Sequence, residues 1–204
     1  MTAVTGLHAS PELSPDALGS AVREAVEFTD AGGWGQPAQL FALVSTALLR
    51  DTQPEWADSL DSSELTVIEQ EPLPVSPESG LAELEHVLGT TAWPEAVAGC
   101  ALVQEILVLP PAAESALDEA LAPVLADPDA ADAAAREAAH SHPDARRARL
   151  AIGALRSGHT LAVMQLQPTD DEGDDDIELL QHRDLAPNLV AALAATLDNP
   201  ANED

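Results

Sequence analysis

Apolar residues near the start of the chain recur every three or four positions, at Leu18, Val22, Ala25 and Val26, and Thr29 falls on the same face. Positions with this spacing share one face of a helix, so the pattern predicts an amphipathic helix. Ser14 can cap its start, Pro15 suits its first position, and Gly32-Gly33 ends it.

Three later segments are mainly apolar or β-branched, without helical periodicity: 40–44, 65–70 and 101–109, the last interrupted by Gln104 and Glu105. The first run is typical of a strand buried on both faces, and the other two also predict strands. Prolines follow the second and third runs and end them. Between the runs, we expect a short helical turn over 54–60 and a short helix over 81–88.

The second half of the chain predicts more helices. Two alanine-rich helices are expected near 113–125 and 129–140. The second is the weaker of the two, because an apolar face made almost entirely of alanine buries little area per residue. Asp184 is placed to cap a last helix, whose apolar positions are Leu185, Leu189, Leu193 and Leu197.

The clearest strand pair lies before that last helix. A tight Ser157-Gly158 turn joins residues 147–156 to residues 159–167, which predicts a β-hairpin. The order is then helix, three strands with helical insertions, helix, hairpin and helix. This order predicts the α+β class, with a single, mainly antiparallel sheet of about five strands and helices packed on it.

The predicted elements also give the expected limits of the domain. We expect a single domain over residues 14–197, with flexible ends at residues 1–13 and 198–204. The long insertion between the second and third strands leaves the strand order open.

Charge narrows the range of partners. The chain has 36 Asp+Glu against 8 Lys+Arg, all of them arginine, for a net charge of −28. This charge repels nucleic acid and anionic lipid, whose binding depends on cationic side chains. No run of about 18 apolar residues is present, so no membrane span is expected. The start of the chain lacks the cationic and apolar features of a secretory signal, so we expect a cytoplasmic protein.

Two origins of the acidity remain open. A GC-rich genome, the origin that we favour, disfavours lysine codons, whereas adaptation to high salt selects acidic surfaces. The arginines also allow two interpretations. Five of them gather at Arg136, Arg146, Arg147, Arg149 and Arg156. We favour pairing with neighbouring carboxylates over a local positive patch that binds RNA.

The absence of lysine excludes several kinds of chemistry. P-loop, protein-kinase, Schiff-base and pyridoxal phosphate sites all require a lysine. No Gly-x-Gly-x-x-Gly follows a strand, and no Gly-x-Ser-x-Gly elbow is present. The single cysteine, Cys100, excludes an intrachain disulfide and a cysteine-rich zinc site. We interpret Cys100 as a buried core thiol rather than a nucleophile. No cofactor is expected.

Two segments could hold a metal ion. His140 and His142 form a His-x-His pair, and Asp144 would add an oxygen ligand. A helix end is the simpler interpretation, because a proline follows and histidine suits the C-terminal end of a helix. The acidic segment 170–178 could ligate calcium but lacks the spacing of a helix–loop–helix calcium site, so we favour a solvated loop.

The tryptophans are the candidate binding residues. Trp93 stands beside Pro94, directly before the third strand. It either seals the edge of the sheet or contributes, with Trp34 and Trp56, to a surface that binds a partner, because exposed tryptophan dominates interface energetics.

Several stretches carry a family resemblance. The segments WGQP and LFALVST, VIEQEPLP, TAWPEAVAGCALVQE and RLAIGALRSGH resemble a family of small acidic actinobacterial proteins of unknown function. The resemblance covers most of residues 15–197 and implies an intracellular bacterial protein, with no catalytic residues to transfer. The element order also resembles that of type III secretion chaperones, which are acidic, usually dimeric peptide-binding proteins. Those chaperones lack the helices inserted here, so this second resemblance concerns topology alone.

These observations lead to two hypotheses. The first is a non-enzymatic domain, adaptor-like or chaperone-like, that binds a protein or peptide partner, with a homodimer as one option. The alternative is a metal-dependent enzyme that uses His140, His142 and Asp144.

Overall fold

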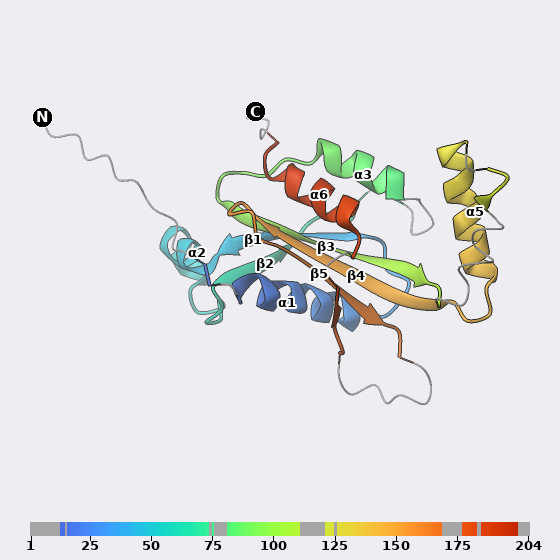
Figure 1. Cartoon of the computed structure of the whole chain (residues 1–204). Coiled ribbons are helices and arrows are strands. Elements are labelled where there is room, and N and C mark those ends of the chain that lie inside the picture. Colours follow the sequence, from blue (N-terminus) through green and yellow to red (C-terminus); the bar gives the residue numbers. More distant parts are fainter. Residues whose placement is uncertain are drawn as a thin grey trace, which may run out of the picture.

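A computed structural model describes residues 13–14, 16–73, 75, 81–110, 121–124, 126–168, 177–182 and 185–199. Its centre is a six-stranded antiparallel sheet in the order β2-β1-β3-β4-β5-β6 (Figure 1). The strands are β1 (Gln39–Ser45), β2 (Leu65–Glu69), β3 (Val97–Val108), β4 (Arg146–Leu155), β5 (Thr160–Leu166) and β6 (Leu180–Gln181). The predicted α+β class with one mainly antiparallel sheet is confirmed.

Two features of the sheet differ from the prediction. The two-residue strand β6 was not predicted, because its sequence has no strand pattern of its own and it only adds to the edge of β5. Strand β3 begins four residues early, at Val97, because its first residues pair with both β1 and β4. Gly99 permits this, since a Cβ there would collide with the Ala154 carbonyl oxygen.

The helices are α1 (Ala17–Ala31), α2 (Thr46–Thr52), the 3-10 turn η1 (Pro54–Trp56), α3 (Leu81–Thr90), α5 (Pro128–Ser141) and α6 (Pro187–Thr196). Helix α2 was not predicted. It follows β1 directly, and the Ser45 hydroxyl at its N-cap accepts a hydrogen bond from the Leu48 N–H at 3.4 Å. The helix expected near 113–125 lies mostly outside the described residues.

Both predicted helix caps need correction. The N-cap of α1 is Asp16 rather than Ser14, and it makes no side-chain capping bond. Helix α6 starts at Pro187, after Ala186 in a left-handed conformation (φ 47°). The predicted cap, Asp184, lies outside the described residues. A proline at the first position stabilises this start without a side-chain cap.

The helices cover the two faces of the sheet unequally (Figure 1). Helices α3 and α6 pack side by side on one face, and among the described helices α1 alone packs on the other. Gly153 of β4 lets α1 approach closely, because a Cβ there would lie 2.5 Å from Val22 Cγ2. Within the described part of the chain, no helix is long and apolar enough to cross a membrane.

Candidate functional site

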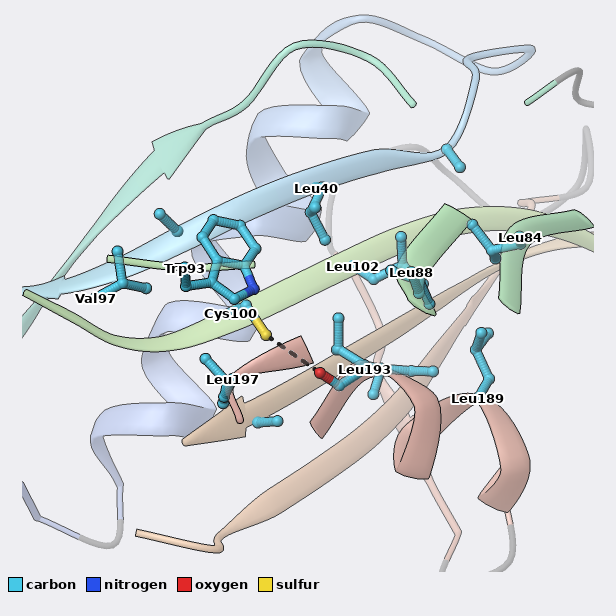
Figure 2. Packing of buried hydrophobic residues seen from close by; sticks show 14 of the residues in the cluster. Leu40, Leu84, Leu88, Trp93, Val97, Cys100, Leu102, Leu189, Leu193 and Leu197 are labelled. Carbon is cyan, nitrogen blue, oxygen red and sulfur yellow. Dashed lines mark hydrogen bonds between the residues drawn. The ribbon is translucent and has the colours of Figure 1, made fainter. Parts of the chain in front are cut away.

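The three tryptophans lie in three different environments. Trp93 is only 5% exposed and belongs to the core between the sheet and helices α3 and α6 (Figure 2). Its indole Nε1–H donates to the Thr196 hydroxyl at 2.9 Å, and that hydroxyl donates to the Leu193 carbonyl at 2.6 Å. The prediction of a shared tryptophan surface is therefore wrong for Trp93, which seals α6 against the sheet.

Cys100 lies in the same core. Its Sγ is 3.7 Å from the Leu193 carbonyl oxygen (Figure 2). It is 3.6 Å from the Thr196 hydroxyl. Burial raises the pKa of the thiol to about 11, although the Thr196 hydrogen bond and Arg156 act in the opposite direction. A protonated, buried thiol is a poor nucleophile, so the interpretation of Cys100 as a core residue is confirmed.

Arg156 fastens this core at one end of the sheet. Its guanidinium donates to the carbonyl oxygens of Val97 at 2.8 Å and Trp93 at 3.1 Å, and to that of Leu197. Arg156 thus joins the segment before β3 to the end of α6. Contrary to the prediction, it is held by backbone carbonyls rather than by carboxylates, because it meets the C-terminal end of a helix.

Trp34 packs against a buried arginine on the other face of the sheet. The Arg149 guanidinium carbon lies 3.9 Å from the centre of the Trp34 ring. Arg149 is fully buried and donates to Asp30, to Gln165 Oε1 at 3.1 Å and to the Gly33 carbonyl at 2.7 Å. The predicted pairing of an arginine with a carboxylate is confirmed here.

Glu105 completes this arrangement. Its Oε1 accepts hydrogen bonds from the N–H groups of Gly35 at 2.7 Å and Gln36 at 3.2 Å. Gly33 and Gly35 have φ values of 76° and 92°, which residues with a Cβ rarely adopt. The loop is therefore fixed, and Trp34 is half-buried as part of a structural cluster.

Trp56 is the exposed tryptophan, with 49% of its surface accessible. It ends η1, the turn directly after α2, and α2 also carries the exposed side chain of Leu48. Of the predicted binding residues, Trp56 alone presents a largely open side chain in the described part of the chain.

A groove of about 1200 Å³ lies beside Leu48, where α1, α2 and the β4–β5 turn meet. Leu18 and Gly19 line it from α1, and Leu161 lines it from β5. Gly19 leaves open space, because a Cβ built there has no heavy atom within 4 Å. The groove is open to solvent and large enough for a short peptide segment.

The charged groups of the groove are mainly free carboxylates. Asp16, Asp51 and Glu95 line it, and none of them pairs with a cation of the described chain. Arg23 and Arg156 also line the groove, where Arg23 lies 3.8 Å from Glu27 and Arg156 donates to backbone carbonyls. The groove can therefore accept cationic groups from a partner.

The groove also contains a serine and a histidine in contact. The Ser157 hydroxyl lies 3.0 Å from His159 Nδ1, across the β4–β5 turn. Nucleophilic catalysis needs a third group that orients the base and donors that stabilise an oxyanion. Within the described residues, no carboxylate is bonded to His159, so the contact stabilises the turn.

The candidate metal ligands sit at a helix end. His140 and Ser141 belong to the last turn of α5, and the His142 N–H donates to the Ala139 carbonyl at 3.4 Å. His142 Nδ1 accepts from the Asp144 N–H at 3.2 Å. The side chain of His140 lies outside the described residues. Among the groups that the structure does describe, no three potential ligands gather around a common point.

Most of the acidic segment 170–178 lies outside the described residues, so the calcium hypothesis stays a prediction. The expected flexible ends also lie almost entirely outside them. Leu13 is an exception, since it packs partly buried against the core beneath α1.

Comparison with known proteins gives a family. A family model described as PPA1309-like protein matches residues 18–198. The chain belongs to this family. The PPA1309-like match runs from the first turn of α1 to just beyond α6, so it covers all described elements of the fold. No curated protein and no solved structure matches the chain.

The groove was missed by sequence reasoning. Its walls come from segments around residues 19, 48, 96 and 160, which are far apart in the chain. No local signal marked it, because helix α2, which carries Leu48, was itself not predicted. Sequence reasoning chose the tryptophans as candidate binding residues, and one of them, Trp93, is buried.

Proposed function

We propose that this PPA1309-like chain is a non-enzymatic protein-binding domain that takes a short segment of a partner protein into the groove between α1, α2 and the β4–β5 turn. The observation that carries the proposal is the groove itself. It joins apolar walls, at Leu18 and Leu161, to the exposed Leu48 and to carboxylates that have no described cationic partner.

The electrostatics favour a basic or amphipathic partner segment. With a net charge of −28, the whole molecule attracts cations, and its field steers such a segment before contact. Once bound, apolar side chains of the segment would cover Leu48 and the groove walls, and its cations would meet Asp16, Asp51 and Glu95. The affinity should fall as the salt concentration rises.

The setting proposed for this activity is the cytoplasm of an actinobacterium, as the sequence resemblance implies. An adaptor role and a chaperone-like role both fit a groove that binds a short segment. The topological resemblance to type III secretion chaperones, and the homodimer that it implies, stay predictions.

Filling the groove tests the proposal. Gly19→Phe places a ring in the groove, and Gly89→Phe on α3 is the matched control, because a Cβ at Gly89 also has no neighbour within 4 Å. Both changes replace a helical glycine and should raise helix propensity. Tagged wild-type and variant chains are used to capture partners from a lysate of the native host, at low and moderate salt.

We expect a stoichiometric partner that binds wild-type protein and Gly89→Phe, is lost with Gly19→Phe, and weakens as salt rises. A partner that binds Gly19→Phe equally well would show that the groove is not the site. Capture of no partner by any of the three chains would count against protein binding. Elemental analysis of the same samples tests the metal-enzyme hypothesis, which predicts close to one bound metal ion that is lost in His142→Ala.

A further inference from the structure

The flank of α1 that faces β2 carries an exposed aromatic side chain. Phe28 is 51% exposed, and its ring contacts the buried Phe41 of β1 edge-to-face, with centroids 5.8 Å apart. Phe41 pairs with Glu69 of β2, so Phe28 lies over the end of the sheet where β2 finishes. The groove lies at the other end of α1, around Asp16 to Arg23, and neither Phe28 nor β2 lines it.

Carboxylates crowd around Phe28. Glu24 is one helical turn before it on α1, and burial together with the nearby charges of Asp61 and Glu27 raises the pKa of Glu24. Glu69 and Glu71 are exposed at the end of β2. One cation near this flank is engaged, because the Arg50 guanidinium donates to the backbone carbonyl of Asp61.

The outer edge of β2 offers backbone hydrogen-bonding groups. The Thr46 N–H donates to the Glu64 carbonyl, and the Gln70 N–H donates to the Leu40 carbonyl, so even-numbered residues of β2 bond to β1. In an antiparallel pair the intervening residues turn their N–H and C=O groups the other way. Leu65 is buried, whereas Val67 is half-buried and Glu69 is exposed. No described strand pairs with this edge.

We propose that this flank is a second interaction surface, which binds an extended cationic segment of a partner protein. The segment adds beside Val67 and Glu69 as a further strand, covers Phe28 with an apolar side chain and places its cations among the carboxylates. A second copy of the chain fits less well, because each copy carries a net charge of −28. The proposal does not depend on the groove.

The probe is a fluorescent heptapeptide of alternating arginine and valine, titrated into the full-length chain and followed by anisotropy. Its control has the same sequence with N-methylated valines, which keeps the charge but removes alternate backbone donors. We expect the control to bind at least about ten-fold more weakly. Equal affinity of the two peptides would show adventitious attraction to an acidic protein and overturn the proposal.

Variants locate the site. Phe28→Ser and Val67→Pro should each weaken the probe about ten-fold, and proline is tolerated at Val67 because its N–H is not needed by β1. The matched control is Leu180→Ser on β6, which removes another exposed apolar side chain. Gly19→Phe should leave probe binding unchanged, so this surface and the groove can fail separately. If Leu180→Ser weakened binding of the probe as much as Phe28→Ser does, the proposal would be contradicted.

Amide hydrogen exchange gives a readout that does not require any variant. The bound probe should slow exchange at Val67 and Glu69 and leave Thr66 and Ile68, already bonded to β1, unchanged. Slowed exchange at Val67 and Glu69 without probe, together with a dimer mass in solution, would identify a second copy as the occupant and overturn the cationic-segment proposal.

Discussion

The two faces of the sheet are covered by different numbers of helices, and this difference explains where the molecule is closed and where it is open. On one face α3 and α6 lie side by side, and the core that they cover contains Trp93 and Cys100 (Figures 1 and 2). On the other face α1 is the one helix that the described residues place there, with the Arg149 cluster at its C-terminal end and the groove at its N-terminal end.

The widths of the sheet and of a helix account for the difference between the two faces. Six strands at roughly 4.8 Å spacing are about 24 Å wide, whereas one helix covers about 10 Å. Two helices nearly cover such a sheet, but one helix leaves part of its face to shorter segments and to open surface. Ile177 and Leu179 pack, partly buried, on this face as well. The groove lies at the N-terminal end of α1, beside α2 and the β4–β5 turn, and Phe28 with the edge of β2 lies along the flank of α1 that faces β2. Both proposed surfaces therefore follow from the single-helix face.

The largest expected loss of stability follows a change in the Arg149 cluster, at the C-terminal end of α1. Arg149→Met removes the cation between Asp30 and Glu105, leaving carboxylates without their partner, and should lower the free energy of unfolding by about 3 kcal/mol. Urea denaturation measures this change. Arg147→Met, at an exposed position two residues earlier on the same strand, is the control and should change stability by less than about 0.5 kcal/mol. An equally small effect at Arg149 would show that the cluster does not hold α1.

The next effect tests how closely α1 packs. Gly153→Val forces side-chain atoms toward Val22 and Leu18 and should cost about 2 kcal/mol. Adding Val22→Ala provides room, so the double variant should lose less stability than the sum of the two single variants. Thermal unfolding of the four chains gives the coupling. Strict additivity would mean that α1 shifts freely over β4.

A pH effect should arise on the two-helix face. The Cys100 thiol has a pKa of about 11 when folded and about 8.5 when unfolded, so between these values only the unfolded chain loses the proton. The free energy of unfolding should therefore fall by about 1–2 kcal/mol from pH 8 to pH 10. The chain has no lysine or tyrosine that would titrate there, which isolates the effect. In Cys100→Ala the free energy of unfolding should no longer fall between pH 8 and pH 10. If it falls as in the wild-type chain, a group other than Cys100 causes the effect.

The smallest of these effects concerns one buried hydrogen bond. Thr196→Val keeps the shape of the side chain but leaves the Trp93 indole N–H without its acceptor, at a cost of about 1 kcal/mol. Thr90→Val is the matched control, since the Thr90 hydroxyl bonds to a carbonyl at an exposed helix end. Urea midpoints and the fluorescence of Trp93 report the change. Equal costs at the two threonines would show that the Trp93 bond contributes nothing specific.

Local pattern was enough to predict most of the elements. The spacing of Leu18, Val22 and Val26 identified α1, and the Ser157-Gly158 turn identified the hairpin, because helix periodicity and turn chemistry depend on residues close in sequence. The burial of Cys100 was also predicted, from its place beside a continuous apolar run. The same local reasoning missed α2 and β6, which are short and depend on the elements that they adjoin.

Contacts between distant segments decided the rest. Trp93 and Thr196 are 103 residues apart, and Arg149 and Asp30 are 119 apart, so no local pattern could predict that one tryptophan is sealed beneath α6 and another rests on a buried arginine. The sequence by itself determined the fold class, the charge and the chemistry excluded by the absence of lysine. Only the tertiary structure decided which side chains stay accessible, because accessibility depends on how many helices cover each face of the sheet.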